Sequence, residues 1–149
     1  MSLPNYSNKT LALQTLIGKI TTCFQSLQRE GMKLGSVSKK GNTFWGLLRL
    51  IDEHGPITVP QIAIKRKVSR QRIQVMVDEY AHDGYLALNV NPVHKRSKLV
   101  NLTAAGKTEL DKLSQSIFSY LEQNSAAFEK EELETTLGVL EKLQDLIEK

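Results

Sequence analysis

The feature that most constrains this chain is a change in the period of its apolar residues directly after Gly84. Apolar residues before this glycine recur at helical spacing, whereas residues 85–91 and 99–103 follow a period of two. The two alternating segments are joined by residues 92–98, with the sequence Pro-Val-His-Lys-Arg-Ser-Lys. The pattern predicts a β-hairpin whose seven-residue tip is basic and longer than the connections that hairpins usually have.

Two short helices are predicted upstream of this hairpin. Residues 43–54 carry apolar side chains at helical spacing, and Gly55-Pro56 is typical of a helix end. Residues 57–59 are rich in β-branched side chains but allow only a stub strand. Pro60 fits the first turn of a helix that we expect from Gln61 to about Lys67.

A further helix is predicted from Arg70 to about Asp83, with Ser69 as its cap and Gly84 at its end. Helical spacing predicts that one face of it is buried, and this face consists of Ile73, Met76, Val77 and Tyr80. Spacing places Gln71, Val75 and Asp78 opposite that face. The candidate contact residues at its exposed start are Ser69, Arg70, Gln71, Arg72 and Gln74.

A helix, a tight turn, a second capped helix and a basic hairpin follow one another in the order of a winged helix-turn-helix. In that fold the second helix enters the major groove of DNA. Arginine can bond guanine and glutamine can bond adenine, each through two hydrogen bonds, while Ser69 and the helix N-terminus suit phosphate. The alternative interpretation is an ordinary surface helix with a solvated polar face.

The hairpin tip carries the second group of candidate contact residues, namely Lys95, Arg96 and Lys98. An arginine in the minor groove with lysines near phosphates is the chemistry by which narrow grooves are recognised. Lysines also protect exposed strands from pairing with other chains, which is the alternative interpretation here.

The charges are distributed unevenly along the chain. Residues 60–103 contain eight Lys and Arg against three Asp and Glu, whereas residues 104–149 contain five against ten. Residues 1–59 contain seven against three. A basic central block favours a polyanion as partner, and nucleic acid is the leading candidate.

Amphipathic helices are predicted on both sides of this block. Residues 8–29 form one helix that should stop at Glu30-Gly31, followed by a loop over residues 31–42. Residues 104–128, with Thr103 as a possible cap, and the segment from Leu133 to Ile147 form two more. These helices have more apolar surface than one small winged helix can cover, so we expect a second subunit to cover it. Packing within one chain is the alternative.

Several classes of function lack the residues they require. One cysteine and three widely spaced histidines give neither a disulfide framework nor a zinc-type pair, and no phosphate-binding glycine loop is present. We therefore expect no cofactor, no metal and no enzyme activity. No apolar run is long enough for a membrane span and no signal peptide is evident, so a cytoplasmic protein is expected.

Motifs between about residues 40 and 110 resemble the MarR family of bacterial transcription regulators. They are the run from Phe44 to Val59, the helix start Val68-Ser69-Arg70, the pair Asn91-Pro92, the pair Lys95-Arg96 and the wing exit Leu102-Thr-Ala-Ala-Gly106. The order of the helices is similar over the whole chain. The resemblance implies an obligate homodimer on a pseudo-palindromic operator, and release of DNA by a small, commonly aromatic or phenolic effector.

One residue departs from the family pattern. His94 stands where the family usually has an aspartate that is thought to brace the wing arginine, so the departure concerns the position of Arg96.

We therefore predict a single domain over residues 1–149, mainly α-helical with a small β-hairpin wing. It comprises a winged helix-turn-helix DNA-binding lobe at 43–103 and dimerisation helices at 8–30 and 104–149. The predicted function is that of a sequence-specific transcriptional repressor released by an effector.

Three other functions stay open: a redox-sensing regulator that uses Cys23, a winged helix that binds protein rather than DNA, and an enzyme with Cys23 as nucleophile. Cys23 neighbours apolar residues in the predicted helix, which favours an inert, buried thiol.

Overall fold

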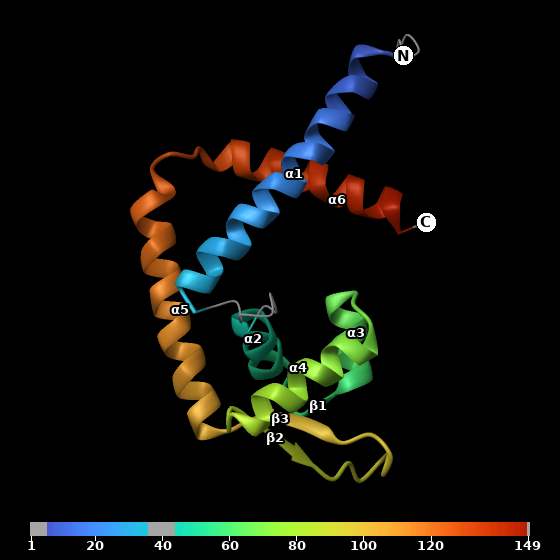
Figure 1. The fold of residues 1–149 in the computed structure, drawn as a ribbon, viewed down its shortest axis with the longest axis vertical. Coiled ribbons are helices and arrows are strands. Elements are labelled where there is room, and N and C mark those ends of the chain that lie inside the picture. The colour runs from blue at the N-terminus through green and yellow to red at the C-terminus, as the bar shows by residue number, and fades with distance from the viewer. Residues whose placement is uncertain (1–5, 36–43, 149) are drawn as a thin grey trace. The chain divides into compact units, whose positions relative to one another are not determined.

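A computed structural model describes residues 6–35 and 44–148 of the chain. Within them it contains six helices and three short strands, whose order is shown in Figure 1. The helices are α1 (Asn8–Lys33), α2 (Phe44–His54), α3 (Val59–Arg66), α4 (Arg70–His82), α5 (Ala104–Ser125) and α6 (Lys130–Ile147). The strands are β1 (Ile57–Thr58), β2 (Leu86–Asn89) and β3 (Leu99–Leu102). The predicted fold class, mainly helical with a small β-hairpin wing, is confirmed.

The chain divides into two compact units at Ser114. The first unit contains α1 to α4, the three strands and the beginning of α5, and the second contains the end of α5 and all of α6. In the parts of the chain that the structure describes, no helix has the length and apolar character needed to cross a membrane.

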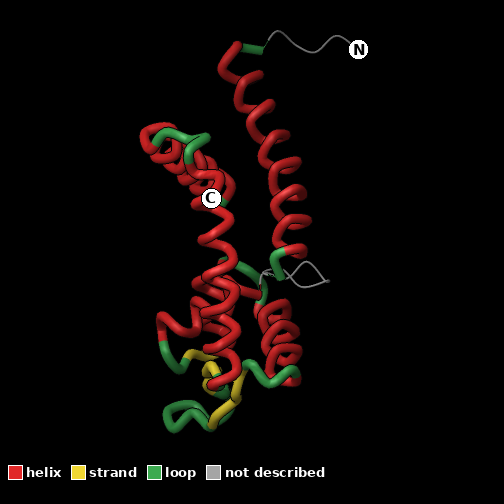
Figure 2. Tube along the Cα trace, turned by 90° about the vertical axis from the view of Figure 1, so that its left-hand side faces the viewer, coloured by secondary structure: helices red, strands yellow, loops and turns green. Residues whose placement is uncertain are grey.

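The three strands form an antiparallel sheet with β3 in the middle. Val100 of β3 is opposite Ile57 of β1 on one side and opposite Leu88 of β2 on the other. Figure 2 shows the strands in yellow and the loop that joins β2 to β3 in green. The predicted stub strand and the predicted hairpin are therefore both present, each shorter than the sequence pattern suggested.

The core of the first unit lies between this sheet and the helices α2, α3 and α4. Its largest fully buried side chains are Leu47, Leu48, Ile51, Ile62, Ile73, Val77 and Val100. Burying one such side chain stabilises a fold by about 1.5–3 kcal/mol. The face of α4 predicted to be buried is buried at all four positions. This core therefore holds α4 with its polar face outward.

Local capping explains where α3 begins. The Thr58 hydroxyl accepts a hydrogen bond from the Gln61 amide, and the Gln61 side chain accepts one from the Thr58 amide in return. Because the cap is at Thr58, the helix starts at Val59, and the prediction that Val59 continues the strand is wrong. Pro60 lies in the first turn, as predicted.

Two other predicted helix ends are also wrong. α1 does not stop at Glu30-Gly31, because Gly31 is accommodated inside the helix and the chain leaves it at Gly35, which has a positive φ of 75°. Residues 36–42 of the predicted loop, and Thr43, lie outside the described residues. α5 ends at Ser125 rather than near residue 128.

The apolar faces predicted for α1 and α6 are largely exposed in the single chain. Exposed large apolar side chains on these two helices include Leu13, Ile17, Phe24, Leu27, Leu133, Leu137, Leu140, Leu146 and Ile147. Cys23 is exposed as well, so the prediction that it is buried is wrong for the single chain. A second molecule would be needed to cover it.

The wing, the end of α4 and the start of α5 meet at Thr103. Its hydroxyl donates a hydrogen bond to the Gly84 carbonyl over 2.7 Å and accepts one from the Gly106 amide over 2.9 Å, so it caps α5 as predicted. Gly106 is buried against the backbone of Tyr85, so closely that a Cβ on Gly106 would overlap the Tyr85 carbonyl oxygen.

We expect Gly106→Ala to lower the free energy of unfolding by about 1–3 kcal/mol, because backbone atoms must move to admit the methyl group. Urea denaturation measures the change. Ala105→Ser adds one atom at the exposed neighbouring position and should change stability by about 0.5 kcal/mol or less. Equal effects of the two substitutions would contradict the close contact at Gly106.

Candidate nucleic-acid interface

The N-terminal turn of α4 presents polar side chains to solvent. The Ser69 hydroxyl accepts a hydrogen bond from the Arg72 amide over 3.2 Å and so fixes where the helix begins. All five candidate residues of this segment are exposed, namely Ser69, Arg70, Gln71, Arg72 and Gln74. The first amides of a helix have no acceptor within the helix, and Ser69 caps only that of Arg72. The other amides of this turn can therefore bind a ligand.

The turn before α4 contributes cations that the sequence analysis did not select. Lys65 and Arg66 are the last residues of α3. Lys67 is its C-cap, in the left-handed conformation with φ of 52°, and begins the turn to α4. Lys65 and Lys67 are exposed, whereas Arg66 is partly buried. Burial, and then the positive charge of Arg72, lower the pKa of Arg66 from its usual value, although an arginine stays charged at neutral pH. The run of three basic residues was a signal for this patch.

The wing is held at its base by Asn91, a buried polar residue with 6% of its surface exposed. Its side-chain oxygen accepts hydrogen bonds from the amides of Val93 and His94, at 3.0 and 3.3 Å. The Ser97 amide donates to the His94 carbonyl over 2.9 Å. This Asx turn shapes the tip, on which Lys95, Arg96 and Lys98 are exposed as predicted.

The two predicted groups of residues meet in one groove of about 510 Å³. Arg70, Gln71 and Gln74 line it from α4, and Arg96 and Lys98 line it from the wing. The remaining three candidates, Ser69, Arg72 and Lys95, do not line it.

His94 does not prevent Arg96 from reaching this groove. The side chain of His94 is exposed, and within the described residues Arg96 forms no ion pair. Arg96 therefore lies beside α4 with no carboxylate of the described residues paired to it. Its guanidinium is available to an external anion.

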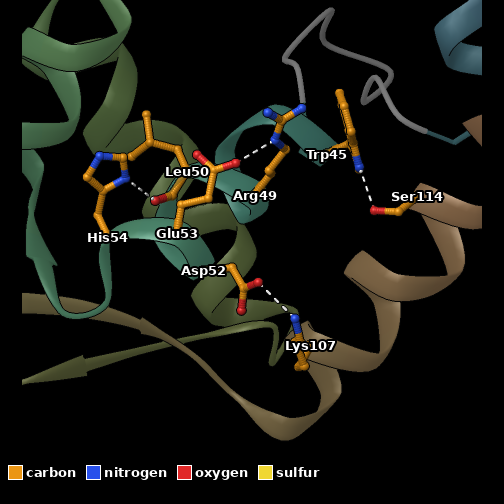
Figure 3. A network of polar contacts seen from close by, with 8 residues as sticks. All are labelled: Trp45, Arg49, Leu50, Asp52, Glu53, His54, Lys107 and Ser114. Atoms are coloured by element: carbon orange, nitrogen blue, oxygen red, sulfur yellow. Dashed lines mark hydrogen bonds and ion pairs between the residues drawn. The ribbon is translucent and has the colours of Figure 1, made fainter. Parts of the chain in front are cut away.

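Polar contacts join α2 to the first half of α5 (Figure 3). The Trp45 indole N–H donates a hydrogen bond to the Ser114 hydroxyl over 2.9 Å, and the Lys107 ammonium contacts the Asp52 carboxylate at 2.8 Å. The hydrogen bond with Asp52 raises the pKa of Lys107 above its usual value. Arg49 and Glu53 form a further ion pair along α2, at 2.7 Å.

The described residues give little support for a metal site or for chemistry at Cys23 and the histidines. No three side chains of the metal-binding types lie close enough together there to hold an ion. Cys23 is exposed on α1. His82 is exposed at the end of α4, and His54 contacts the Leu50 carbonyl within its own helix.

Comparison with curated proteins finds weak relatives. Uncharacterized proteins Mb2034c of Mycobacterium bovis and Rv2011c of Mycobacterium tuberculosis are each 29% identical over 89 residues, which is 60% of this chain. The matched segment spans only 62% of the length of these relatives. No family model matches the sequence.

Comparison with solved structures finds the same fold. A mutant of MarR from Escherichia coli complexed with operator DNA aligns with a TM-score of 0.74 and 21% identity, over 94% of this chain and 99% of that one. The transcriptional regulator BldR from Sulfolobus solfataricus aligns at 0.70 and 19%, over 93% and 96%. A MarR family protein from Bacillus stearothermophilus aligns at 0.65 and 19%, over 97% and 99%. The predicted resemblance to the MarR family is thus confirmed for the fold.

We expect Asn91→Ala to loosen the wing without unfolding the chain, because the amides of Val93 and His94 lose their acceptor. Hydrogen exchange of residues 93–98 should become about tenfold faster. Asn89→Ala, at the exposed end of β2, is the matched control and should leave these rates unchanged. If the wing exchanges equally fast in both variants, Asn91 does not hold it.

Proposed function

We propose that this chain, which has the fold of the MarR-family transcriptional regulators, is a non-enzymatic regulator that binds a specific sequence of double-stranded DNA. The observation that carries the proposal is the groove in which the polar start of α4 and the tip of the wing meet. Five of the eight predicted contact residues line it. The similar E. coli MarR was solved with operator DNA.

In this proposal α4 enters the major groove with its N-terminal turn. Arg70, Arg72, Gln71 and Gln74 are of the types that bond base edges, and Ser69 with the helix N-terminus suits a phosphate. Exposure of all five side chains, together with burial of the opposite face, supports this orientation.

The wing then lies along the neighbouring minor groove. Arg96 enters that groove, while Lys95 and Lys98 neutralise phosphates. Lys65 and Lys67, at the turn before α4, extend the same positive surface along the backbone. Most of this charge acts on any DNA sequence, so the specificity comes from α4.

We also propose that the protein acts as a homodimer on a pseudo-palindromic operator. The winged helix-turn-helix lobe is at residues 43–103, and the dimerisation helices are at 8–30 and 104–149. The exposed apolar faces of α1 and α6 support this, because side chains such as Phe24 and Leu137, each more than half exposed, are rarely left in water in such numbers. One lobe supplies only half of the contacts that an operator offers.

We further propose that the protein is a cytoplasmic repressor that releases DNA when a small aromatic or phenolic effector binds. This role rests on the resemblance to the MarR family. DNA release by a series of aromatic acids, measured on the operator once it is known, tests it directly.

The test of DNA binding begins with selection of sites from a library of random duplexes, which should enrich a pseudo-palindromic sequence. Affinity for that sequence should fall steeply as the salt concentration rises, because each neutralised phosphate releases counterions. A chain that enriches no sequence and binds no duplex at low salt would instead be a protein-binding winged helix.

We expect Arg96→Ala to weaken binding to the selected site by about tenfold or more, because the wing loses its minor-groove contact. Lys95→Ala and Lys98→Ala should weaken all sequences similarly and lower the salt slope by about one each. Lys130→Ala, on α6, is the control and should leave the slope unchanged. Full affinity of the Arg96 variant would show that the wing does not contact DNA.

We expect Leu140→Glu with Leu143→Glu to give a monomer or a poorly soluble chain that no longer binds the selected site. Two unpaired charges in a buried interface cost several kcal/mol. The control is Thr135→Glu with Lys142→Glu, on the opposite face of α6 by helical spacing. Sedimentation of the leucine variant as an intact dimer would contradict the proposed interface.

A further inference from the structure

A hydrogen bond joins two side chains one turn apart on the exposed face of α4. The Gln74 amide nitrogen donates to a carboxylate oxygen of Asp78 over 2.8 Å. Both residues are exposed, and both line the groove that also contains Arg70, Arg96 and Lys98. The bond is therefore part of the surface that, in the proposed function, faces the bases.

The bond determines which groups Gln74 has left to offer. A glutamine amide has two N–H donors and one carbonyl acceptor. With one N–H held by Asp78, the second N–H and the carbonyl oxygen stay available, and they lie side by side when the held N–H is the one that points away from the oxygen. Adenine presents one acceptor and one donor in the major groove, and a glutamine amide can satisfy both at once. Asp78 accepts from the nitrogen alone, so it selects one of the two amide orientations.

The carboxylate of Asp78 also has a cost in affinity. Of the described residues that line the groove, Asp78 is the only acid, among the cations Arg70, Arg96 and Lys98. A negative charge beside DNA weakens binding to every sequence. Its placement on α4 is unfavourable for general affinity and is explained if the carboxylate contributes to choosing the sequence.

We propose that Asp78 is a positioning residue that fixes the Gln74 amide for the recognition of one adenine in each half-site of the DNA. The inference rests on the proposed function, and it assigns to Asp78 a role in specificity that acts entirely through Gln74. Holding the amide before DNA arrives also removes part of the cost of ordering a flexible side chain on binding. A charged acceptor suits this task because it binds an N–H more strongly than a neutral one.

The test compares the sequences that the full-length protein and its variants select from random duplexes. The wild type should prefer adenine at one position of each half-site by about tenfold or more. Gln74→Ala and Asp78→Ala should both lose this preference while keeping the other positions of the motif. The double variant should show no loss beyond that of either single variant, because the two residues act as one unit.

Asp78→Glu keeps an acceptor-only carboxylate one turn from Gln74, so it should retain the adenine preference. Asp78→Asn offers an N–H as well as an oxygen and no longer selects one Gln74 orientation, so the preference should weaken, while affinity for all sequences should rise as the repulsion disappears. A thermal melt of each variant checks that the fold is intact. A residue with only a structural role would change the melt and would not change the preference at a single base.

Each other outcome has a definite meaning. If Asp78→Ala keeps the adenine preference that Gln74→Ala loses, or if Asp78→Glu loses it as fully as Asp78→Ala, the positioning role is wrong. A wild-type motif whose adenines are unaffected by Gln74→Ala overturns it too. If the wild type selects no motif at all, the proposed function fails, and this inference fails with it.

Discussion

The arrangement of the first unit depends on the contacts around Thr103. One hydroxyl group contacts the end of α4 through the Gly84 carbonyl and the start of α5 through the Gly106 amide. The Thr103 amide also donates to the Tyr85 carbonyl, at the entry to the wing. Three elements therefore meet within a few ångströms, and the meeting requires a residue without a side chain at position 106. The motif Leu102-Thr-Ala-Ala-Gly106 has a packing explanation that is independent of DNA binding.

A second set of contacts extends this rigid connection to α2. The Trp45–Ser114 hydrogen bond and the Lys107–Asp52 ion pair join α2 to α5 at two points separated by about two helical turns. The exposed ion pair contributes little stability by itself. The ion pair instead restricts the position of α5, because α5 cannot rotate about the Trp45–Ser114 contact while the Lys107–Asp52 contact is in place. A displacement of the first half of α5 must consequently involve Thr103 and, through it, the wing.

The sequence predicts those parts of the interface that follow from periodicity and caps. The buried face of α4 and the cap at Ser69 follow from spacing and residue type, and both are confirmed. The end of α1 was mispredicted because a single glycine costs a helix only about 1 kcal/mol, which neighbouring turns can offset. The Gln74–Asp78 bond has the i, i+4 spacing at which helix side chains can meet, but residue types alone do not show whether each polar side chain bonds this neighbour or faces solvent. The groove itself joins residues more than twenty positions apart, which no local pattern can show.

The uneven charge of the chain acts together with this geometry. Residues 104–149 carry twice as many acids as bases, and much of α6 combines acidic residues with an exposed apolar face. DNA is repelled by such a surface, whereas an apolar partner surface is not. The basic side chains of residues 60–103 gather instead at the turn before α4, at its first turn and on the wing. An approaching duplex is therefore attracted to the surface that contains Gln74 and away from the surface that we assign to the second subunit. Electrostatics thus directs a duplex to the basic surface of the first unit before any specific contact forms.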